Sequence, residues 1–403
     1  MKHIWVSVLL IAISFSAGGL DMAEIYDKAE EFSDIFSDPN TGLTVFPTLM
    51  VPTGGKYEGM GTAYSAVALD SGYMEANPSA SSVLDNTELS FLHNNWIADS
   101  NLEGVVYTMR LNDLGIGFGG KFLYVPFSSY NDFGERIGSG YYSETVATAN
   151  VSYNFFSSYH FYGVALGANV KVAYRSVPAT TVSDQSALAG LLDVGALTRL
   201  NFLKFYSSRS KNFSIGVVLK NLGPMVKNEP LPTAVTLGLA YSPFRPIIIA
   251  YDLNIPVGYG QGAEQINMAG GLDVSVTDFF SIQSGFNYRG ANPRFTLGGS
   301  VDLKNVSFVA NYTLDLSTQF EAFDRFSIEA KINLGDEGRL ALRNRVDEYY
   351  LIGVEEFADG NLDKAIAAFE RAIELDPGFV PAIDYLAEVK RQQENRDRLK
   401  SLQ

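Results

Sequence analysis

The sequence has no cysteine, and it has only 3 histidines and 2 tryptophans among its 403 residues. Without cysteine there are no disulfides, no thiolate metal sites and no cysteine nucleophile. His3, His93 and His160 lie far apart in the sequence, so they form no metal-binding or catalytic motif. No motif places two acidic residues as a catalytic pair either. We therefore expect a protein that is not an enzyme and that uses no cofactor and no metal.

Positive charge is also scarce, with 30 Lys and Arg against 45 Asp and Glu and a formal net charge of −15. Binding to nucleic acid requires a basic surface, so we expect no nucleic acid partner. Hydrophobic residues make up 46% of the chain, a share that excludes a disordered protein. The length suffices for one large domain with attachments.

Long hydrophobic runs are missing as well, apart from a short one at the N-terminus. Lys2 supplies a positive start, residues 4–15 are apolar, and small residues follow. This is the pattern of a secretory signal peptide, whereas a membrane helix would need about 20 apolar residues. We predict a signal peptide over residues 1–17, and therefore a protein that leaves the cytoplasm.

Residues 18–88 precede the first predicted strand, and we expect them to form an N-terminal helix followed by a plug. Apolar residues at three- and four-residue spacing predict an amphipathic helix over residues 22–36. Residues 53–82 are rich in Gly and Ala, and their crowded glycines resemble a phosphate-binding loop. The glycine spacing fits neither the dinucleotide-binding nor the Walker pattern. Tight packing of the backbone explains these small residues better.

From residue 89 to residue 334, apolar side chains alternate with small, polar or charged ones, as in the segment VSFVANYTLDL of residues 306–316. Because successive side chains of a strand point to opposite faces, each strand has one apolar face. The pattern predicts about fourteen strands of roughly ten residues, the length that crosses a bilayer at a tilt.

The connections between these strands alternate in length. Residues 112–113 and 304–305 read as tight turns, whereas residues 125–141 and 175–187 read as longer loops. Barrels of the bacterial outer membrane have short periplasmic turns and longer outer loops. We therefore predict an all-β fold, an antiparallel transmembrane β-barrel over residues 89–334. It would lie in the bacterial outer membrane with both termini in the periplasm.

After the barrel, residues 335–403 have a helical period, and we expect a small periplasmic helical domain. Residues 346–379 fit a tetratricopeptide repeat of about 34 residues. A free-standing solenoid needs about three repeats, so a single one either packs on the barrel or oligomerises. It is either a structural cap or a docking site for a periplasmic protein partner. The packing positions of the repeat are Tyr349, Gly353, Ala365, Phe369, Ala372 and Pro377.

The segment GMGTAYSAVALDSGYMEANPSASS (residues 59–82) resembles the motif that precedes the first strand of FadL-type (FadL- and TodX-like) outer-membrane transporters. Related PorV-like barrels carry a similar motif, in which a Gly/Ala-rich stretch leads into Asn-Pro-Ala. Asn77 and Pro78 match the Asn-Pro, and Ser79 replaces the usual Ala. The resemblance implies a barrel plugged by an N-terminal hatch that contains Glu75, Asn77, Pro78 and Ser79. The appended repeat departs from the family, whose barrels normally end at the last strand.

What the resemblance implies for function is the uptake of hydrophobic compounds, typically long-chain fatty acids. Aromatic and apolar residues of two predicted outer loops are candidates for capturing such a ligand, although they would equally serve to cover the barrel mouth. They are Phe127, Tyr130, Phe133, Tyr141 and Met225.

A lumenal cation would pair with a carboxylate headgroup. Lys121 and Lys171 are candidates by their parity in the strands, and Arg110 is a third. Such cations more often pair with lumenal acids. The alternative function is an outer-membrane scaffold, or an accessory barrel for secretion or assembly, whose repeat docks partner proteins.

Overall fold

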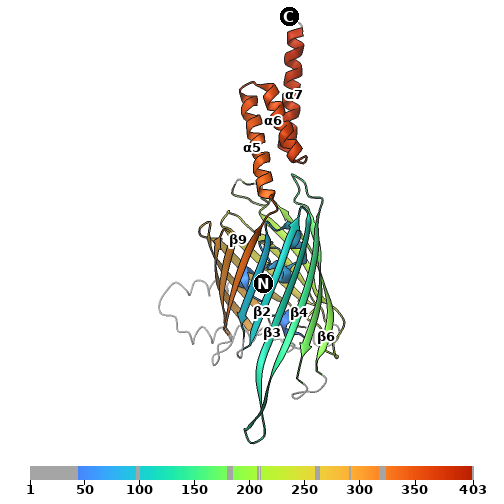
Figure 1. Cartoon of the computed structure of the whole chain (residues 1–403), viewed down its shortest axis with the longest axis vertical. Coiled ribbons are helices and arrows are strands. Elements are labelled where there is room, and N and C mark those ends of the chain that lie inside the picture. The colour runs from blue at the N-terminus through green and yellow to red at the C-terminus, as the bar shows by residue number, and fades with distance from the viewer. Residues whose placement is uncertain are drawn as a thin grey trace, which may run out of the picture.

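The computed structural model describes residues 44–401 apart from 97–99, 179–184, 207, 209, 259–263, 290–291 and 317–323. The predicted signal peptide and the predicted amphipathic helix lie outside the described residues. Within the described part, fourteen antiparallel strands close into a barrel, and β1 pairs with β14 (Figure 1). The predicted all-β barrel of about fourteen strands is therefore confirmed.

Strand length varies around the barrel, from 8 residues in β8 to 20 in β4. One expectation needs correction, because β3 and β4 continue through most of the predicted loop of residues 125–141. Their pairing extends to Tyr130 and Arg136, so the segment projects beyond the rim as a two-stranded hairpin (Figure 1). The strands are β1 (Thr87–Asn95), β2 (Asn101–Leu111), β3 (Leu114–Tyr130), β4 (Arg136–Phe155), β5 (Val164–Ser176), β6 (Ala187–Leu200), β7 (Phe213–Leu222), β8 (Ala234–Tyr241), β9 (Ile247–Pro256), β10 (Asn267–Ser275), β11 (Phe280–Arg289), β12 (Asn292–Leu303), β13 (Val306–Asp315) and β14 (Arg325–Gly335).

The outer surface of the barrel is apolar. On β13, Phe308 and Tyr312 are both 47% exposed, whereas the alternate residues Asn311 and Thr313 are 2% and 1% exposed. Soluble proteins rarely expose a large continuous apolar patch, and this belt matches the lipid-facing surface of a transmembrane barrel. Every strand contributes an exposed large apolar side chain, for example Phe91, Val105, Phe118, Val151, Leu166, Leu188, Val217, Leu239, Ile249, Leu272, Ile282, Leu297, Phe308 and Phe326.

The two ends of the barrel differ in their connections. At the short-turn end, residues 112–113 join β2 to β3 and residues 304–305 join β12 to β13. Asn112 and Lys304 have positive φ values of 54° and 46°, which suits the turns of two-residue hairpins. At the opposite, long-loop end lie the connection of residues 223–233 and the projecting β3–β4 hairpin. The predicted alternation of turn lengths holds at these connections, but residues 156–163 and 201–212 form longer connections at the short-turn end.

Residues 44–86, called the plug, run through the barrel interior from the long-loop end to the start of β1. The N–H of Val45 donates to the carbonyl of Pro230 at 3.0 Å, and Arg110 Nη1 donates to the carbonyl of Leu84 at 3.0 Å. Thus the first described residues lie at the end opposite the C-terminal helices. Residues 1–43 lie outside the described part, so a periplasmic N-terminus stays a prediction. The plug contains η1 (Pro47–Leu49), α3 (Gly55–Gly59), α4 (Tyr73–Ala76) and η2 (Pro78–Val83).

The barrel core lies between the plug and the wall, where the plug side chains of Tyr64 and Tyr73 are fully buried. Glycines of the wall allow the plug backbone to approach closely. A Cβ at Gly195 of β6 would collide with Oδ1 of Asn77 and with the Pro78 ring, which leaves room only for glycine. Glycine weakens a strand interior, and its presence there is explained by this close backbone approach.

Three helices, α5 (Arg339–Ala358), α6 (Leu362–Leu375) and α7 (Val380–Ser401), follow β14 and stand at the short-turn end (Figure 1). Ala365, Phe369 and Ala372 of α6 are buried, and Gly353 of α5 faces the Phe369 ring. A partly buried Tyr349 packs against the same cluster, and Pro377 lies just past the end of α6. No helix in the described residues is long and apolar enough to cross a membrane.

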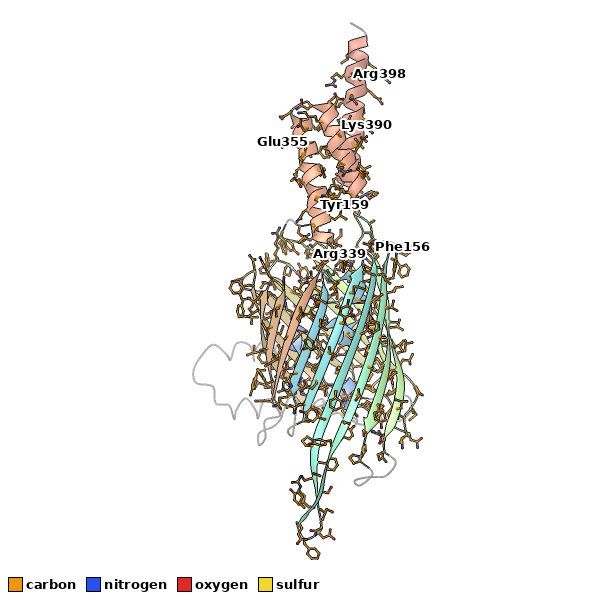
Figure 2. The ribbon with its side chains drawn as sticks, in the orientation of Figure 1. Phe156, Tyr159, Arg339, Glu355, Lys390 and Arg398 are labelled. Carbon is orange, nitrogen blue, oxygen red and sulfur yellow. The ribbon has the colours of Figure 1, made fainter. Side chains whose placement is uncertain are left out.

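The helices contact the barrel directly, in the region that Figure 2 labels. The Tyr159 ring, from the β4–β5 connection, lies edge-on to the Phe379 ring with centroids 5.7 Å apart. Arg339, the first residue of α5, donates from Nη1 to the carbonyl of Arg110 at 2.8 Å and from Nη2 to that of Asp85 at 2.6 Å. The repeat therefore packs on the barrel and touches the residues where the plug leaves it.

Asp336 connects the last strand to α5 by satisfying backbone groups at the helix start. Its carboxylate accepts from the N–H of Leu340 at 2.6 Å and from that of Gly338 at 3.0 Å. These two donors, Leu340 above all, hold the pKa of the Asp336 carboxyl below its usual value. The carboxylate is thus the form that caps the helix.

Candidate lumenal binding site

A cavity lies between the plug and the wall toward the long-loop end, with an empty volume of about 1770 Å³ that includes the part open to solvent. Apolar plug residues such as Leu49, Met50 and Met74 line it on one side. In a chain of net charge −15, its lining holds more basic residues than acidic ones. The basic residues are Lys121, Lys171, Lys220, Arg289, Arg294 and Arg325, and the acidic ones are Glu58, Glu75 and Glu264.

Lys121, one predicted headgroup ligand, lines the cavity, but its amino group binds residues of the plug. Its Nζ lies 2.9 Å from a carboxylate oxygen of Glu75 and donates to the carbonyls of Thr48 and Val51 at 3.3 and 3.1 Å. Glu75 also accepts from the backbone N–H of Thr53 at 3.3 Å. The pair therefore ties two parts of the plug to β3.

The other two predicted cations also have partners. Lys171 Nζ lies 2.6 Å from Asp193 and donates to Asn221 Oδ1 at 3.1 Å, on the cavity wall. Arg110 lies at the short-turn end, away from the cavity, and donates to the carbonyls of Leu84 and Asn112 at 3.0 and 2.6 Å. A headgroup role for these three residues stays a prediction.

The Asn-Pro motif holds the plug to β4 and β6. Asn77 Nδ2 donates to the carbonyls of Ser65 and Ala196 at 2.7 and 3.1 Å, and Oδ1 accepts from the N–H and hydroxyl of Ser79 at 3.1 and 2.7 Å. The Pro78 carbonyl accepts from Asn150 Nδ2 at 2.9 Å. Both polar ends of the Asn77 side chain are therefore satisfied in a fully buried position.

Two further side chains of the barrel wall hold the plug, and the sequence did not predict their contacts. Asp252 of β9 accepts from the N–H groups of Tyr64 and Ser65 at 3.1 and 3.0 Å and from the Ser65 hydroxyl at 2.8 Å. Lys331 of β14 lies 2.7 Å from Asp70. Strand parity places both side chains in the lumen, but it does not indicate which plug residue each one meets.

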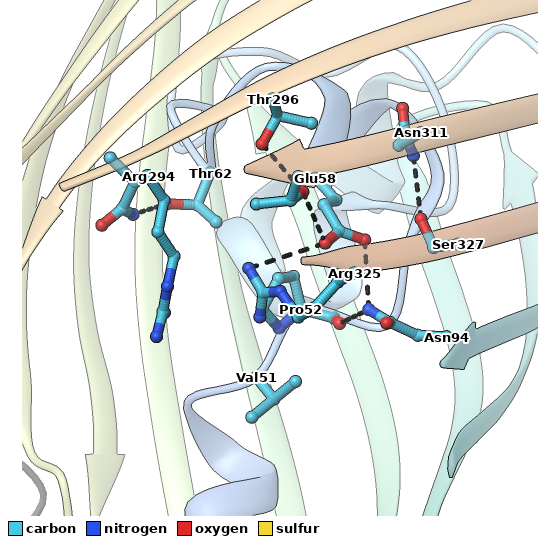
Figure 3. A network of polar contacts seen from close by, with 12 residues as sticks. Val51, Pro52, Glu58, Thr62, Asn94, Arg294, Thr296, Asn311, Arg325 and Ser327 are labelled. Atoms are coloured by element: carbon cyan, nitrogen blue, oxygen red, sulfur yellow. Dashed lines mark hydrogen bonds and ion pairs between the residues drawn. The ribbon is translucent and has the colours of Figure 1, made fainter. Parts of the chain in front are cut away.

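A polar network joins α3 of the plug to β1, β13 and β14 (Figure 3). The Glu58 carboxylate accepts from Asn94 Nδ2 and from the Thr313 hydroxyl, both at 3.1 Å, and lies 3.7 Å from Arg325 Nη2. The Thr313 and Thr296 hydroxyls are 3.0 Å apart. Alternation along β12–β14 assigns Thr296, Thr313 and Arg325 to the lumen, but none of them is among the predicted ligand-binding residues.

The predicted capture residues lie outside the cavity lining. On the β3–β4 hairpin, Tyr130 is 61%, Phe133 90% and Tyr141 64% exposed, and Phe127 is half-buried against Gly140. Met225 of the 223–233 connection is 52% exposed. In the same connection, Val226 and Leu231 pack against Val45 and Phe46 of the plug. The structure thus couples this loop to the plug, while the hairpin stands apart from it.

No cluster of His, Asp or Glu side chains in the described residues is arranged to hold a metal ion.

Residues 23–337 match the Uncharacterised protein family (UPF0164), and residues 346–379 match the tetratricopeptide repeat, the same range that the sequence pattern predicts. One UPF0164 protein of Treponema pallidum (strain Nichols) is 27% identical over 372 residues, which cover 87% of this chain and 84% of the relative. A second from that organism is 24% identical over 362 residues, covering 83% and 72%.

Among solved structures, a deltaS2 mutant of the TodX monoaromatic hydrocarbon channel aligns with a TM-score of 0.44 and 12% identity. The alignment covers 67% of this chain and 97% of that one. The KdgM porin aligns with a TM-score of 0.31 and 9% identity over 61% of this chain and 99% of the porin.

Proposed function

This chain belongs to the Uncharacterised protein family (UPF0164), and we propose that it is a bacterial outer-membrane transporter of hydrophobic compounds. Long-chain fatty acids are the cargo that the FadL-type sequence motif suggests. In this proposal the ligand enters from the long-loop end, occupies the lumenal cavity, and passes inward when the plug shifts.

The apolar belt on all fourteen strands supports the membrane location, because soluble proteins rarely expose such a surface to water. Closure of the barrel leaves no unpaired strand edge for lipid to meet. Outer-membrane barrels place their short turns in the periplasm, so the helices at the short-turn end would be periplasmic.

The observation that carries the proposal is the cavity beside the plug. It opens near the long-loop end, where residues 230–234 and 256–258 line it, and apolar side chains share its wall with cations. The plug then fills the lumen from Met60 to Leu84 with buried side chains. A lumen of this kind favours a bound, gated cargo over free diffusion through water.

Capture by the projecting hairpin is part of the same proposal. Phe133 and Tyr141 expose a large aromatic area at the tip and flank of the hairpin, which would offer a first contact to an apolar ligand. Replacing Phe127, Tyr130 and Phe133 by Ala should slow uptake of a labelled long-chain fatty acid. Normal surface assembly together with unchanged uptake would remove the hairpin from the mechanism.

The transport proposal is tested with the full chain in the outer membrane of a host that lacks a fatty-acid transporter. Uptake of a labelled long-chain fatty acid above the empty-vector rate is the expected result. Background uptake by a correctly assembled, heat-modifiable barrel would overturn it. Extraction of co-purified lipid from the folded protein gives a second, independent readout.

A partner-docking role is the second candidate, and the position of the repeat favours it. The α5–α7 helices contact the barrel only at its short-turn end and project beyond it (Figure 2), and Leu351 of α5 is 63% exposed. Tetratricopeptide repeats commonly bind proteins. Removal of residues 336–403 should then release a co-purifying periplasmic protein while uptake continues, whereas loss of uptake alone would argue for a structural cap.

A further inference from the structure

Arg325, the first residue of β14, is buried in the cavity wall without adequate partners. The residue is 5% exposed, and its Nε and Nη1 atoms have no hydrogen-bond partner among the described residues. A buried charge without partners is costly, so a group that supplies them would stabilise the site.

The nearest carboxylate does not supply them. Glu58 lies 3.7 Å from Arg325 Nη2, beyond ordinary hydrogen-bond distance, and it already accepts from Asn94 and Thr313. Because the Thr313 hydroxyl donates to Glu58, the Thr296 hydroxyl must donate to Thr313. The hydroxyl hydrogens are therefore used, and the free donors of this corner belong to arginine.

A second guanidinium approaches the same corner from β12. Arg294 pairs with Asp315 across strands, but its Nε lies 3.5 Å from the carboxylate and its side chain keeps 34% exposure toward the cavity. β12 and β14 are separated by β13, so the two arginines start roughly 10 Å apart. Both line the same cavity (Figure 3), and an arginine side chain is long enough to reach one small anion from either strand.

Arg289 shows what a satisfied arginine looks like in the same cavity. Its Nε and Nη2 donate to the two carboxylate oxygens of Glu264 at 2.8 and 2.6 Å. This bidentate pair is the geometry in which guanidinium and carboxylate bind most strongly. Arg325 has the same donors and, among the described residues, no such acceptor, and an oxyanion has the geometry to supply one.

We propose that Arg294 and Arg325 form a binding site for the oxyanion head, a carboxylate or a phosphate, of an amphipathic compound. Guanidinium binds both groups through paired hydrogen bonds. The apolar part of the compound would lie along Leu49, Met50 and Leu92 of the cavity wall. The inference rests on the proposed transport of hydrophobic compounds and narrows it to those that carry an anionic head.

The test measures the binding of three probes to the full-length, detergent-purified protein. A long-chain fatty acid carries head and chain, the alcohol of equal length carries only the chain, and inorganic phosphate carries only the charge. The variants are Arg325→Met, Arg294→Met and, as the matched control in the same cavity, Arg289→Met. Heat-modifiable mobility verifies that each variant is a folded barrel.

Arg325→Met should weaken fatty-acid binding by about tenfold or more, with alcohol binding unchanged. Because two donors of Arg325 have no partner and Glu58 lies only as near as 3.7 Å, its removal should change the unfolding temperature of the ligand-free protein little. Arg289→Met should lower stability without this selective loss. Equal losses for acid and alcohol, or an equal selective loss in Arg289→Met, would overturn the site.

Inorganic phosphate distinguishes the source of the anion. Competition between phosphate and the fatty acid, abolished in Arg325→Met, supports a site that also takes a free anion. No competition with a selective loss of acid binding supports recognition of the amphiphile as a whole. Selective binding of the acid without uptake in cells would support this site and contradict the proposed transport. Uptake that does not distinguish the acid from the alcohol would support transport and contradict this site.

Discussion

The two halves of the plug meet the barrel wall in different ways. The inner half, residues 77–83, lies against wall glycines at backbone distance, and Asn77 has partners for its donors and its acceptor. The outer half, residues 44–58, borders a cavity and is held by long side chains of the wall, such as Lys121 of β3, which donates to the carbonyls of Thr48 and Val51.

This difference in packing indicates different roles: the inner half closes the lumen, and the outer half borders a binding site. Backbone packed against glycine leaves no space for water or ligand and yields only by large movement. Ion pairs of long side chains around a cavity exchange partners readily when an anion arrives. We infer that the inner half closes the lumen and that the outer half recognises cargo.

The largest effect is expected from a side chain introduced where the inner half of the plug packs against the barrel wall. Gly195→Leu would collide with Asn77 and Pro78, and overpacking of this kind costs about 1–3 kcal/mol or more. We expect a displaced plug, seen as ion conductance in planar bilayers and as a lower unfolding temperature. Gly190→Leu on the same strand is the control, since nothing lies within 4 Å of its Cβ position. Equal behaviour of the two variants would contradict a seal at Gly195.

The next effect comes from the hydrogen bonds of the seal. Asn77→Ala removes partners from Ser65 and Ser79 in a fully buried place, and each unsatisfied group costs about 1–3 kcal/mol. The free energy of unfolding should fall and conductance should rise. Asn77→Asp keeps the acceptor but turns a carboxyl oxygen toward the carbonyls of Ser65 and Ala196 in a fully buried place, so its loss of stability should be at least as large. An Asp variant as stable as the wild type would show that the Nδ2 hydrogen bonds contribute little.

The Glu75–Lys121 pair, which bonds to Thr53 and Val51 of the outer half, offers a contrasting double-mutant cycle. Glu75→Gln or Lys121→Met alone leaves a largely buried charge without its partner, whereas the double variant leaves none. We expect a coupling energy of about 0.5–3 kcal/mol from chemical denaturation, with bilayers remaining closed to ions. Conductance in the single variants would show that this pair belongs to the seal.

The smallest effect is expected at the contact between the helices and the plug exit. Arg339→Met loses the hydrogen bonds to the carbonyls of Arg110 and Asp85, worth about 1 kcal/mol in total for an accessible side chain. Hydrogen exchange of residues 84–86 should become faster, and Arg343→Met, at an exposed position further along α5, should leave it unchanged. Unchanged exchange in Arg339→Met would mean that the repeat does not steady the plug.

The sequence predicted the barrel because a strand in a membrane has an invariant period, and residues 306–316 display it without knowledge of any contact. It also predicted the repeat, whose packing positions recur at fixed spacing. The partners of Lys121 and Arg325 could not be predicted in this way. Their parity in the strands assigns both side chains to the lumen. The path of the plug, which the strand pattern does not reveal, brings Glu75 to Lys121 and leaves Arg325 without a full set of partners.

The predicted long loop of residues 125–141 failed for a related reason. The alternation of connection lengths predicted a loop there, yet β3 and β4 keep pairing beyond the rim as far as Tyr130 and Arg136. The sequence also shows a cluster of glycines in the plug. The glycines of the barrel wall, such as Gly195, determine how closely the plug and the wall approach.

Movement of the inner half during transport is the central claim, and a reversible covalent lock tests it most directly. The hydroxyls of Ser81 in the plug and Ser152 in β4 are 2.6 Å apart, and the chain has no cysteine of its own. In the Ser81→Cys, Ser152→Cys variant, oxidation should stop fatty-acid uptake and reductant should restore it, while either single variant stays active. Undiminished uptake by a fully cross-linked protein would show that cargo passes without movement of the plug and would contradict the account.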